Sequence, residues 1–185
     1  MKADEPFNPN IKSATTPSDI LFKLADNEHI DSICNLMVER NPLDKIEDIK
    51  KKTEREISLN TNDPEYWLYV AVIENEVVGL CRFYHSRGLP KAKIKFDSPE
   101  GWYAMGTLVS QKHRRKSIAK FLFQERLKVL KGFNASALFS IVDANNSTSV
   151  KMHQEFGFEE SDRAEGFLHL DFPEAGAILF KLKIN

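Results

Sequence analysis

Two hydrophobic periodicities divide this chain into helices and strands. Apolar side chains recur at the i, i+3, i+4 and i+7 positions of an amphipathic helix at Ile30, Ile33, Cys34 and Met37. Asp26 or Asn27 can cap this helix, and Pro42 ends the segment. A second helix is predicted over residues 43–59, with its dense charged face in solvent.

Runs of β-branched and aromatic residues predict the strands. In chain order these runs are residues 20–25, 66–73, 77–84, 103–109, 137–142, 167–172 and 177–184. The polar residues 74–76 join two of them as a hairpin, and residues 86–101 form a loop that shapes a substrate entrance.

Two more helices each follow a strand. One runs from Ser117 to about Lys131, and the other begins at Asn146 or Ser147 and ends at Gly157. The predicted order is β-α-α-β-β-β-α-β-α-β-β, and its β-α-β passages require a pair of parallel strands. The sequence therefore predicts an α/β fold of the α+β type, with about seven strands in a central mixed sheet flanked by about four helices.

Length and composition indicate one globular domain. The chain has 185 residues, of which 42% are hydrophobic and 29% are charged. We expect residues 1–18 to be a polar, partly disordered extension and residues 19–185 to form the single domain. The net charge of −1 gives the protein no general attraction to nucleic acid or to an anionic membrane.

The cysteines and the lack of long apolar runs bear on location. Cys34 and Cys81 lie in apolar segments without metal-ligand spacing, so we expect buried, reduced thiols and no metal. No run of about 18 apolar residues and no signal peptide is apparent, so a cytoplasmic protein is expected.

A candidate anion site lies between residues 109 and 122. A strand ends there in a cationic turn, and a helix begins near Ser117 with outward-pointing N–H groups. The turn carries four basic residues, Lys112, Arg114, Arg115 and Lys116. Such a helix start binds a phosphate or pyrophosphate. Neither G-x-x-x-x-G-K-S/T nor a G-x-G-x-x-G after a strand is present, so the usual modes of ATP and NAD binding are excluded.

Two motifs carry a resemblance to a known family. Arg114 to Ala119, preceded by Val109, corresponds to an Arg/Gln-x-x-Gly-x-Gly/Ala pyrophosphate loop. Residues 146–158 correspond to an Asn-x-x-Ala-x-x-Leu-Tyr-x-x-x-Gly-Phe helix. With both motifs on the expected scaffold, residues 19–185 resemble the GNAT superfamily of acyl-CoA-dependent N-acetyltransferases.

The resemblance implies a GNAT-like fold and acetyl-CoA as co-substrate. A primary amine, on a small molecule or a peptide, would attack the thioester directly in a ternary complex. The pantetheine arm would lie between strands 103–109 and 137–142 and pair with main-chain groups. The implied cofactor-binding residues are Leu108, Val109, Arg114, Arg115, Lys116, Ser117, Ile118, Ala119, Lys120, Asn146 and Ser149.

Two positions depart from the family pattern. Ser117 replaces a Gly; with helical backbone angles it still presents its N–H, but its Cβ crowds the pyrophosphate. His153 replaces the Tyr that is taken to protonate the departing thiolate, so His153 is the predicted catalytic acid, as imidazolium or as a neutral N–H donor. The alternative is a partly exposed helix residue without a proton role. No general base is identified, with Glu100 and Asp143 among the candidates.

Other functional classes remain open at this point. The two departures favour a non-catalytic acyl-CoA-binding or sensing domain as the main alternative. A nucleic-acid patch at residues 112–116 is disfavoured, because the basic run is short and the net charge is slightly negative. The strands at the C-terminus offer an edge for a homodimer.

Overall fold

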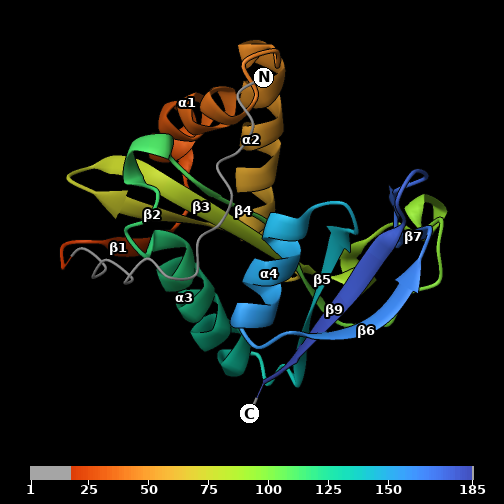
Figure 1. The fold of residues 1–185 in the computed structure, drawn as a ribbon. Helices are drawn as coiled ribbons and strands as arrows, with labels where there is room; N and C mark the ends of the chain where they lie inside the picture. Colours follow the sequence, from red (N-terminus) through yellow and green to blue (C-terminus); the bar gives the residue numbers. More distant parts are fainter. Residues whose placement is uncertain (1–17, 185) are drawn as a thin grey trace.

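A computed structural model describes residues 18–184 and shows a mixed sheet of seven strands with helices on both faces (Figure 1). The strands are β1 (Leu21–Leu24), β2 (Tyr66–Ile73), β3 (Glu76–His85), β4 (Trp102–Val109), β5 (Ala137–Asp143), β6 (Glu159–Ala164) and β9 (Ala177–Lys183). The α-helices are α1 (Ile30–Arg40), α2 (Ile46–Asn62), α3 (Ile118–Gly132) and α4 (Ser147–Glu155). The predicted fold class is confirmed. The extension predicted over residues 1–18 lies outside the described residues, except for its last residue.

The sheet has the order β1-β2-β3-β4-β5-β9-β6, and β4 and β5 form the predicted parallel pair. Their pairing is short, running from Trp102 opposite Leu138 to Ala104 opposite Ser140. Beyond Ala104 the two strands have no paired residues, although β4 remains paired to β3 as far as Val109. The sheet is therefore split between the second half of β4 and the end of β5.

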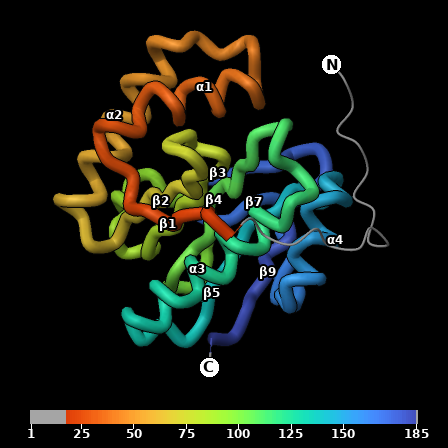
Figure 2. Tube along the Cα trace, turned by 90° about the vertical axis from the view of Figure 1, so that its left-hand side faces the viewer, coloured from red at the N-terminus to blue at the C-terminus, as the bar shows by residue number. Residues whose placement is uncertain are grey.

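The helices cover opposite faces of the sheet: α1 and α2 lie on one side, and α3 and α4 on the other (Figure 2). Ile33 of α1 and Ile57 of α2 belong to a buried cluster with Leu68 of β2. On the other face, Ile118 and Leu122 of α3 pack in a separate cluster on the sheet. The apolar stripes read from the sequence are the surfaces by which the helices contact the sheet.

The predicted strand over residues 167–172 is wrong. Residues 166–171 instead form a small hairpin of β7 (Gly166–Phe167) and β8 (Leu170–Asp171), in which Leu168 has a φ of +53°. The strand that pairs with the outer side of β9 is β6, whose residues are all exposed. An exposed edge strand needs no apolar side chains, so its sequence gave no strand signal. β9 lies inside the sheet, and the outer edge is β6 rather than the last strand of the chain.

Several small features complete the fold. The second helix begins at Ile46, later than predicted. Cys34 and Cys81 are buried free thiols, and burial raises the pKa of both. Within residues 18–184 no group of three or more His, Cys, Asp or Glu side chains is placed to hold a metal ion. No helix in this same part of the chain has both the length and the apolar character needed to cross a bilayer.

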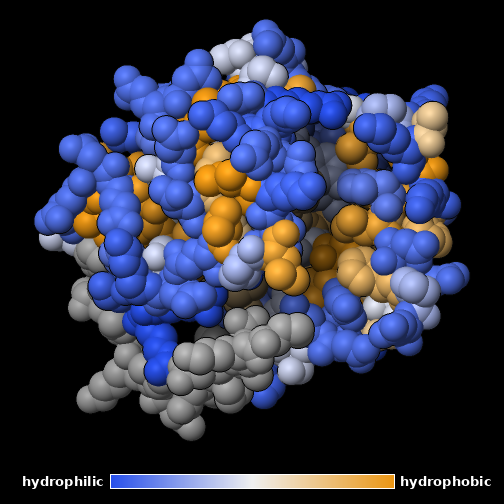
Figure 3. Space-filling view, turned by 90° about the horizontal axis from the view of Figure 1, so that it is seen from above, coloured by the Kyte–Doolittle hydropathy of each residue, from blue (hydrophilic) through white to orange (hydrophobic). Residues whose placement is uncertain are grey.

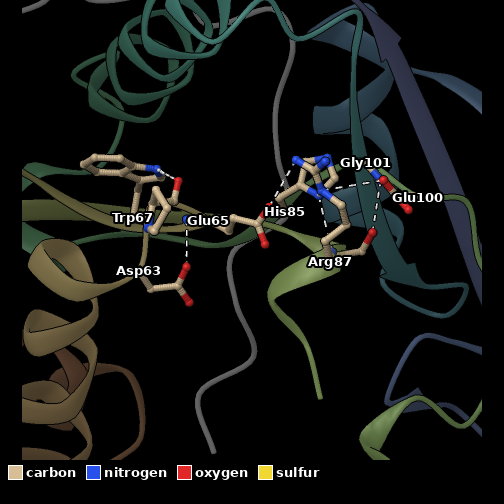
Figure 4. A network of polar contacts seen from close by, with 9 residues as sticks. Asp63, Glu65, Trp67, His85, Arg87, Glu100 and Gly101 are labelled. Carbon is tan, nitrogen blue, oxygen red and sulfur yellow. Dashed lines mark hydrogen bonds and ion pairs between the residues drawn. The ribbon is translucent and has the colours of Figure 1, made fainter. Parts of the chain in front are cut away.

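The loop between β3 and β4 is fixed at its ends by a polar network (Figure 4). Arg87 lies 3.1 Å from a carboxylate oxygen of Glu65 and 3.6 Å from one of Glu100, and its backbone N–H donates to Nδ1 of His85. Glu100 precedes β4, whereas the basic turn follows that strand. The network therefore lies at the end of β4 away from the candidate anion site, and Glu100 is part of a structural ion pair there.

Candidate active site

The split in the sheet begins at an irregularity in β4. The register between β3 and β4 shifts between Leu80 and Arg82, and Gly106 has a φ of +35°. Leu108 is buried, and Val109 packs against the α3 side of the core. The prediction that these two side chains lie in the core is confirmed. β4 thus presents main chain, rather than side chains, to the opening between it and β5.

The basic turn connects this open strand edge to the start of α3. Arg115 and Ser117 have φ values of +63° and +58°, and α3 begins at Ile118. The expectation of ordinary helical angles at Ser117 is wrong, because Ser117 adopts the left-handed conformation that a glycine takes at low cost. At the position of the motif's first glycine, Ser117 thus takes a conformation that favours glycine.

The residues of this turn differ in what they offer a ligand. Arg114, Arg115, Lys116 and Lys120 are exposed, whereas Ile118 is buried and Ala119 is half-buried. The first-turn N–H groups of an α-helix have no acceptor within the helix, which applies to Ile118, Ala119 and Lys120. Lys112 lies 2.6 Å from a carboxylate oxygen of Glu76, so its charge is already paired. The turn combines main-chain donors with exposed cationic side chains, as an anion site requires.

Replacing Ser117 with Gly should stabilise the fold. The left-handed conformation costs a non-glycine residue roughly 1–2 kcal/mol, and the greater chain entropy of unfolded glycine offsets part of this. We expect Ser117→Gly to raise the free energy of unfolding, measured in urea, by about 0.5–1 kcal/mol. Ser117→Ala is the matched control, because it removes the hydroxyl but keeps the Cβ. A gain of equal size in both variants would contradict the explanation.

His153 lies in the core between α4 and the sheet, with 9% of its surface exposed. Its Nδ1 is 2.7 Å from the carbonyl oxygen of Ser149, and its Nε2 is 2.8 Å from Oγ of Ser140. Its ring stacks on Phe180 and meets Phe158 edge-on. Because a carbonyl only accepts, Nδ1 carries the hydrogen, and in the neutral ring Nε2 accepts from the Ser140 hydroxyl. The partly exposed environment considered for this residue is wrong.

The acid role of His153 stays a prediction. The structure shows which protonation state the surroundings of the ring favour. Burial lowers the pKa of His153, and the charge of Arg126 lowers it further, against the opposing bond to the Ser149 carbonyl. The neutral ring is therefore favoured, and its single N–H is held by the protein. The Ser140 hydroxyl lies at the last paired position of β5, which places it between His153 and the opening.

The lowered pKa of His153 predicts how the stability of the fold depends on pH. The unfolded histidine has a pKa of about 6.5, so below that pH the unfolded chain binds a proton that the folded chain resists. Stability should therefore fall as pH drops below about 6.5. In His153→Phe, which keeps an aromatic ring at this site, the fall between about pH 7 and 5 should be shallower. Urea unfolding across this range measures both slopes, and equal slopes would contradict the prediction.

The cap of α4 is confirmed. Asn146 accepts a hydrogen bond from the N–H of Ser149 at 2.9 Å. Asp143, a candidate base, accepts from the N–H of Asn145 at 2.8 Å and so closes a turn. The side chain of Asn146 thus has a structural partner in α4, and Oγ of Ser149 lies 3.4 Å from Nδ1 of His153. The predicted contacts of both residues with a cofactor stay predictions.

Three residues near the split were not found by sequence reasoning. Arg82 on β3 faces α2, where its Nε donates to a carboxylate oxygen of Glu56 at 2.9 Å. Arg126 on α3 approaches the opposite face and donates to Oγ1 of Thr107 at 2.8 Å. Ser140 is the third. Arg82 and Arg126 are separated from their partners by 26 and 19 positions, so no local motif marks them.

Hollows on the molecule offer room for a second substrate. Viewed from above, apolar residues gather around a hollow in a mostly hydrophilic surface (Figure 3). A groove of about 510 Å³ also lies between α1 and the turn after β4. Glu39 and Glu76 are among its lining residues, and the N–H of Gln111 donates to a carboxylate oxygen of Glu39. Lys112 also lines the groove and is paired with Glu76, so Glu39 of α1 gives the groove a net negative charge.

The parallel strands β4 and β5 separate on the side where the basic turn and the start of α3 lie. This arrangement is typical of proteins that bind an extended ligand carrying phosphate groups. The sequence profile of the Acetyltransferase (GNAT) family matches residues 30–158, which is more than half of the chain. The chain therefore belongs to the GNAT family of acetyltransferases. A search among curated proteins gave no significant match.

Solved structures share the fold at low sequence identity. The PaiA N-acetyltransferase of Thermoplasma acidophilum in complex with coenzyme A is 15% identical, with a TM-score of 0.65, 89% of this chain covered and 98% of that one. NAA60 of Arabidopsis thaliana with acetyl-CoA is 19% identical, with a TM-score of 0.64 and coverage of 90% and 99%. The Salmonella typhimurium acetyltransferase that modifies the N-terminal serine of ribosomal protein L7/L12 is 14% identical, with a TM-score of 0.71 and coverage of 91% and 97%.

Proposed function

We propose that this protein moves an acetyl group from acetyl-CoA to a primary amine. One observation carries the proposal: the unpaired edge of β4 leads directly into the basic turn and the start of α3. The pantetheine arm pairs with main chain near Leu108 and Val109, as an added strand would. The pyrophosphate lies at the first N–H groups of α3 beside the cationic side chains.

The reaction is direct acyl transfer in a ternary complex. The neutral amine attacks the thioester carbonyl, the C–N bond forms, and the C–S bond breaks with its electron pair passing to sulfur. The amine proton leaves to water or to a base that is not assigned to a residue. The thiolate takes its proton from water or, through the Ser140 hydroxyl 2.8 Å from Nε2, from His153 when that ring carries a second proton.

The acceptor reaches the thioester from the face covered by α1 and α2. The acidic groove beside α1 suits an amine-bearing molecule, which is cationic before it loses its proton. Both a small-molecule amine and a peptide fit this chemistry. Structurally similar proteins include one that modifies a ribosomal protein N-terminus, which keeps a peptide acceptor among the candidates.

A broad amine screen with detection of released thiol tests the function. Acetyl-CoA is incubated with the protein and with small amines, amino acids and peptides. Free coenzyme A that appears only with one class of amine, together with the acetylated product, supports the proposal. The alternative is a sensing domain, favoured by the replaced glycine and by the buried His153. Calorimetric binding of acetyl-CoA without thiol release across the panel would indicate that alternative.

Location and domain boundaries complete the proposal. We propose that residues 19–185 form the single catalytic domain and that it works in the cytoplasm. Two buried free cysteines support a reducing compartment.

A further inference from the structure

Arg126 is a buried cation without an anionic partner in the part of the chain that the structure describes. It lies on α3 facing the sheet, with 3% of its surface exposed. One guanidinium nitrogen donates to Oγ1 of Thr107 at 2.8 Å, while its buried Nε has no hydrogen-bond partner. No ion pair of Arg126 occurs among residues 18–184.

Arg82, a second buried arginine, does have a carboxylate partner. Arg82 is buried to a similar degree, and its Nε donates to a carboxylate oxygen of Glu56 at 2.9 Å. Burying a guanidinium is unfavourable unless an anion compensates the lost hydration. Arg126 has the burial of Arg82 but lacks the carboxylate, which points to an anion that comes from outside the chain.

The groups around Arg126 do not supply negative charge. From β3 the Cys81 thiol interacts with it, and burial raises the pKa of that thiol, so it is neutral. From α4 the neighbouring group is His153, and its lowered pKa favours the neutral ring. Arg82 also acts on Cys81 and adds positive charge. The surroundings of the guanidinium are neutral or positive.

Thr107 connects this cation to the split in the sheet. Thr107 follows Gly106 in the part of β4 that has no partner on β5, and it is half-buried. Since Arg126 donates to Oγ1 of Thr107, the hydroxyl hydrogen remains to be donated to another group. A hydroxyl donor backed by a full positive charge therefore lies on the part of β4 that borders the opening.

We propose that Arg126 and Thr107 stabilise the coenzyme A thiolate that leaves during acetyl transfer. Thr107 donates a hydrogen bond to the sulfur, and Arg126 supplies the charge behind it. When the C–S bond breaks, its electron pair stays on sulfur as a thiolate, and water protonates that thiolate later. Stabilisation of developing charge by groups fixed in advance lowers the barrier to this step. The inference rests on the proposed function, because it requires coenzyme A in the opening.

The thiol of bound coenzyme A measures this effect without any turnover. A nearby positive charge favours the thiolate and lowers the pKa of the thiol. The thiolate is titrated by its ultraviolet absorbance in the complex, with S-methyl-coenzyme A as the blank for protein thiols. We expect the bound thiol of the wild-type complex to titrate at a lower pH than free coenzyme A.

Four variants test the charge of Arg126 and the hydroxyl of Thr107 separately and include a control for general effects on the fold. Arg126→Met should raise the pKa of the bound thiol by about one unit, a tenfold change in the thiol–thiolate equilibrium. Thr107→Val should give a smaller rise, and Arg126→Lys should keep most of the lowered value. Lys128→Met, an exposed position on the same helix, is the matched control and should match the wild type.

The outcomes distinguish the inference from the proposed function. A bound thiol that titrates alike in wild type, Arg126→Met and Thr107→Val overturns the inference while leaving cofactor binding intact. Failure of the wild type to bind coenzyme A overturns the proposed function and the inference with it. If Arg126→Met does not fold, the pKa of the bound thiol in Thr107→Val and Arg126→Lys tests the inference. Thr107→Val keeps the buried charge and the volume of the side chain, so an unchanged pKa in that variant would contradict the role of the hydroxyl.

Discussion

Ala119→Glu is expected to abolish acetyl-CoA binding while the protein stays folded. Ala119 lies in the first turn of α3, where its N–H is one of the donors without an acceptor in the helix. A carboxylate there repels the pyrophosphate; two like charges about 4 Å apart near a protein surface cost roughly 4 kcal/mol. We expect affinity, measured by calorimetry, to fall at least about 100-fold.

The fold should tolerate this change, because an acidic residue in the first turn of a helix interacts favourably with its dipole. Thermal unfolding of the variant should therefore match or exceed that of the wild type. Gln124→Glu is the matched control, since it adds the same charge on the exposed side of α3. Unchanged affinity in Ala119→Glu would remove the phosphate site from the start of α3.

Glu56→Ala is expected to give a large loss of stability. It leaves Arg82 buried without the carboxylate oxygen that lies 2.9 Å from its Nε. Removing one partner of a buried ion pair costs about 3–5 kcal/mol, since the remaining charge is uncompensated. The free energy of unfolding, measured in urea, should fall by this amount.

Two comparisons identify the cause of that loss. Asp31→Ala breaks the ion pair between Asp31 and Lys50, whose charged atoms are 3.4 Å apart and well exposed, and should cost less than about 1 kcal/mol. Glu56→Leu combined with Arg82→Leu should recover much of the stability, because no unpaired charge remains. A cost for Glu56→Ala no greater than that for Asp31→Ala would contradict the prediction.

The sequence predicted the parts of the site that are built from neighbouring residues. The turn from Val109 to Ala119 and the cap at Asn146 depend on short spacings, so they can be read directly along the chain. β6 was missed because an edge strand with exposed side chains has no hydrophobic period. The apolar run at residues 167–172 predicts a strand, although Leu168 within it turns with a positive φ.

The electrostatics of the site could not be read in this way. Whether Arg82 or Arg126 has a carboxylate depends on which helix packs against which strand. The burial of His153 likewise depends on Phe180, which only the packing of α4 on β9 brings to its ring. These are properties of tertiary contacts, which a motif does not encode.

Because of the split between β4 and β5, the binding of a ligand at the edge of β4 affects the stability of the fold. The second half of β4 lacks the hydrogen bonds to β5 that a continuous sheet would make. A ligand that pairs with this edge binds the folded chain and not the unfolded one, and at about 100 times its dissociation constant it adds about 2.7 kcal/mol of stability. The abundance of such a protein in a cell would then follow the supply of its ligand, because the unfolded fraction is what proteases degrade.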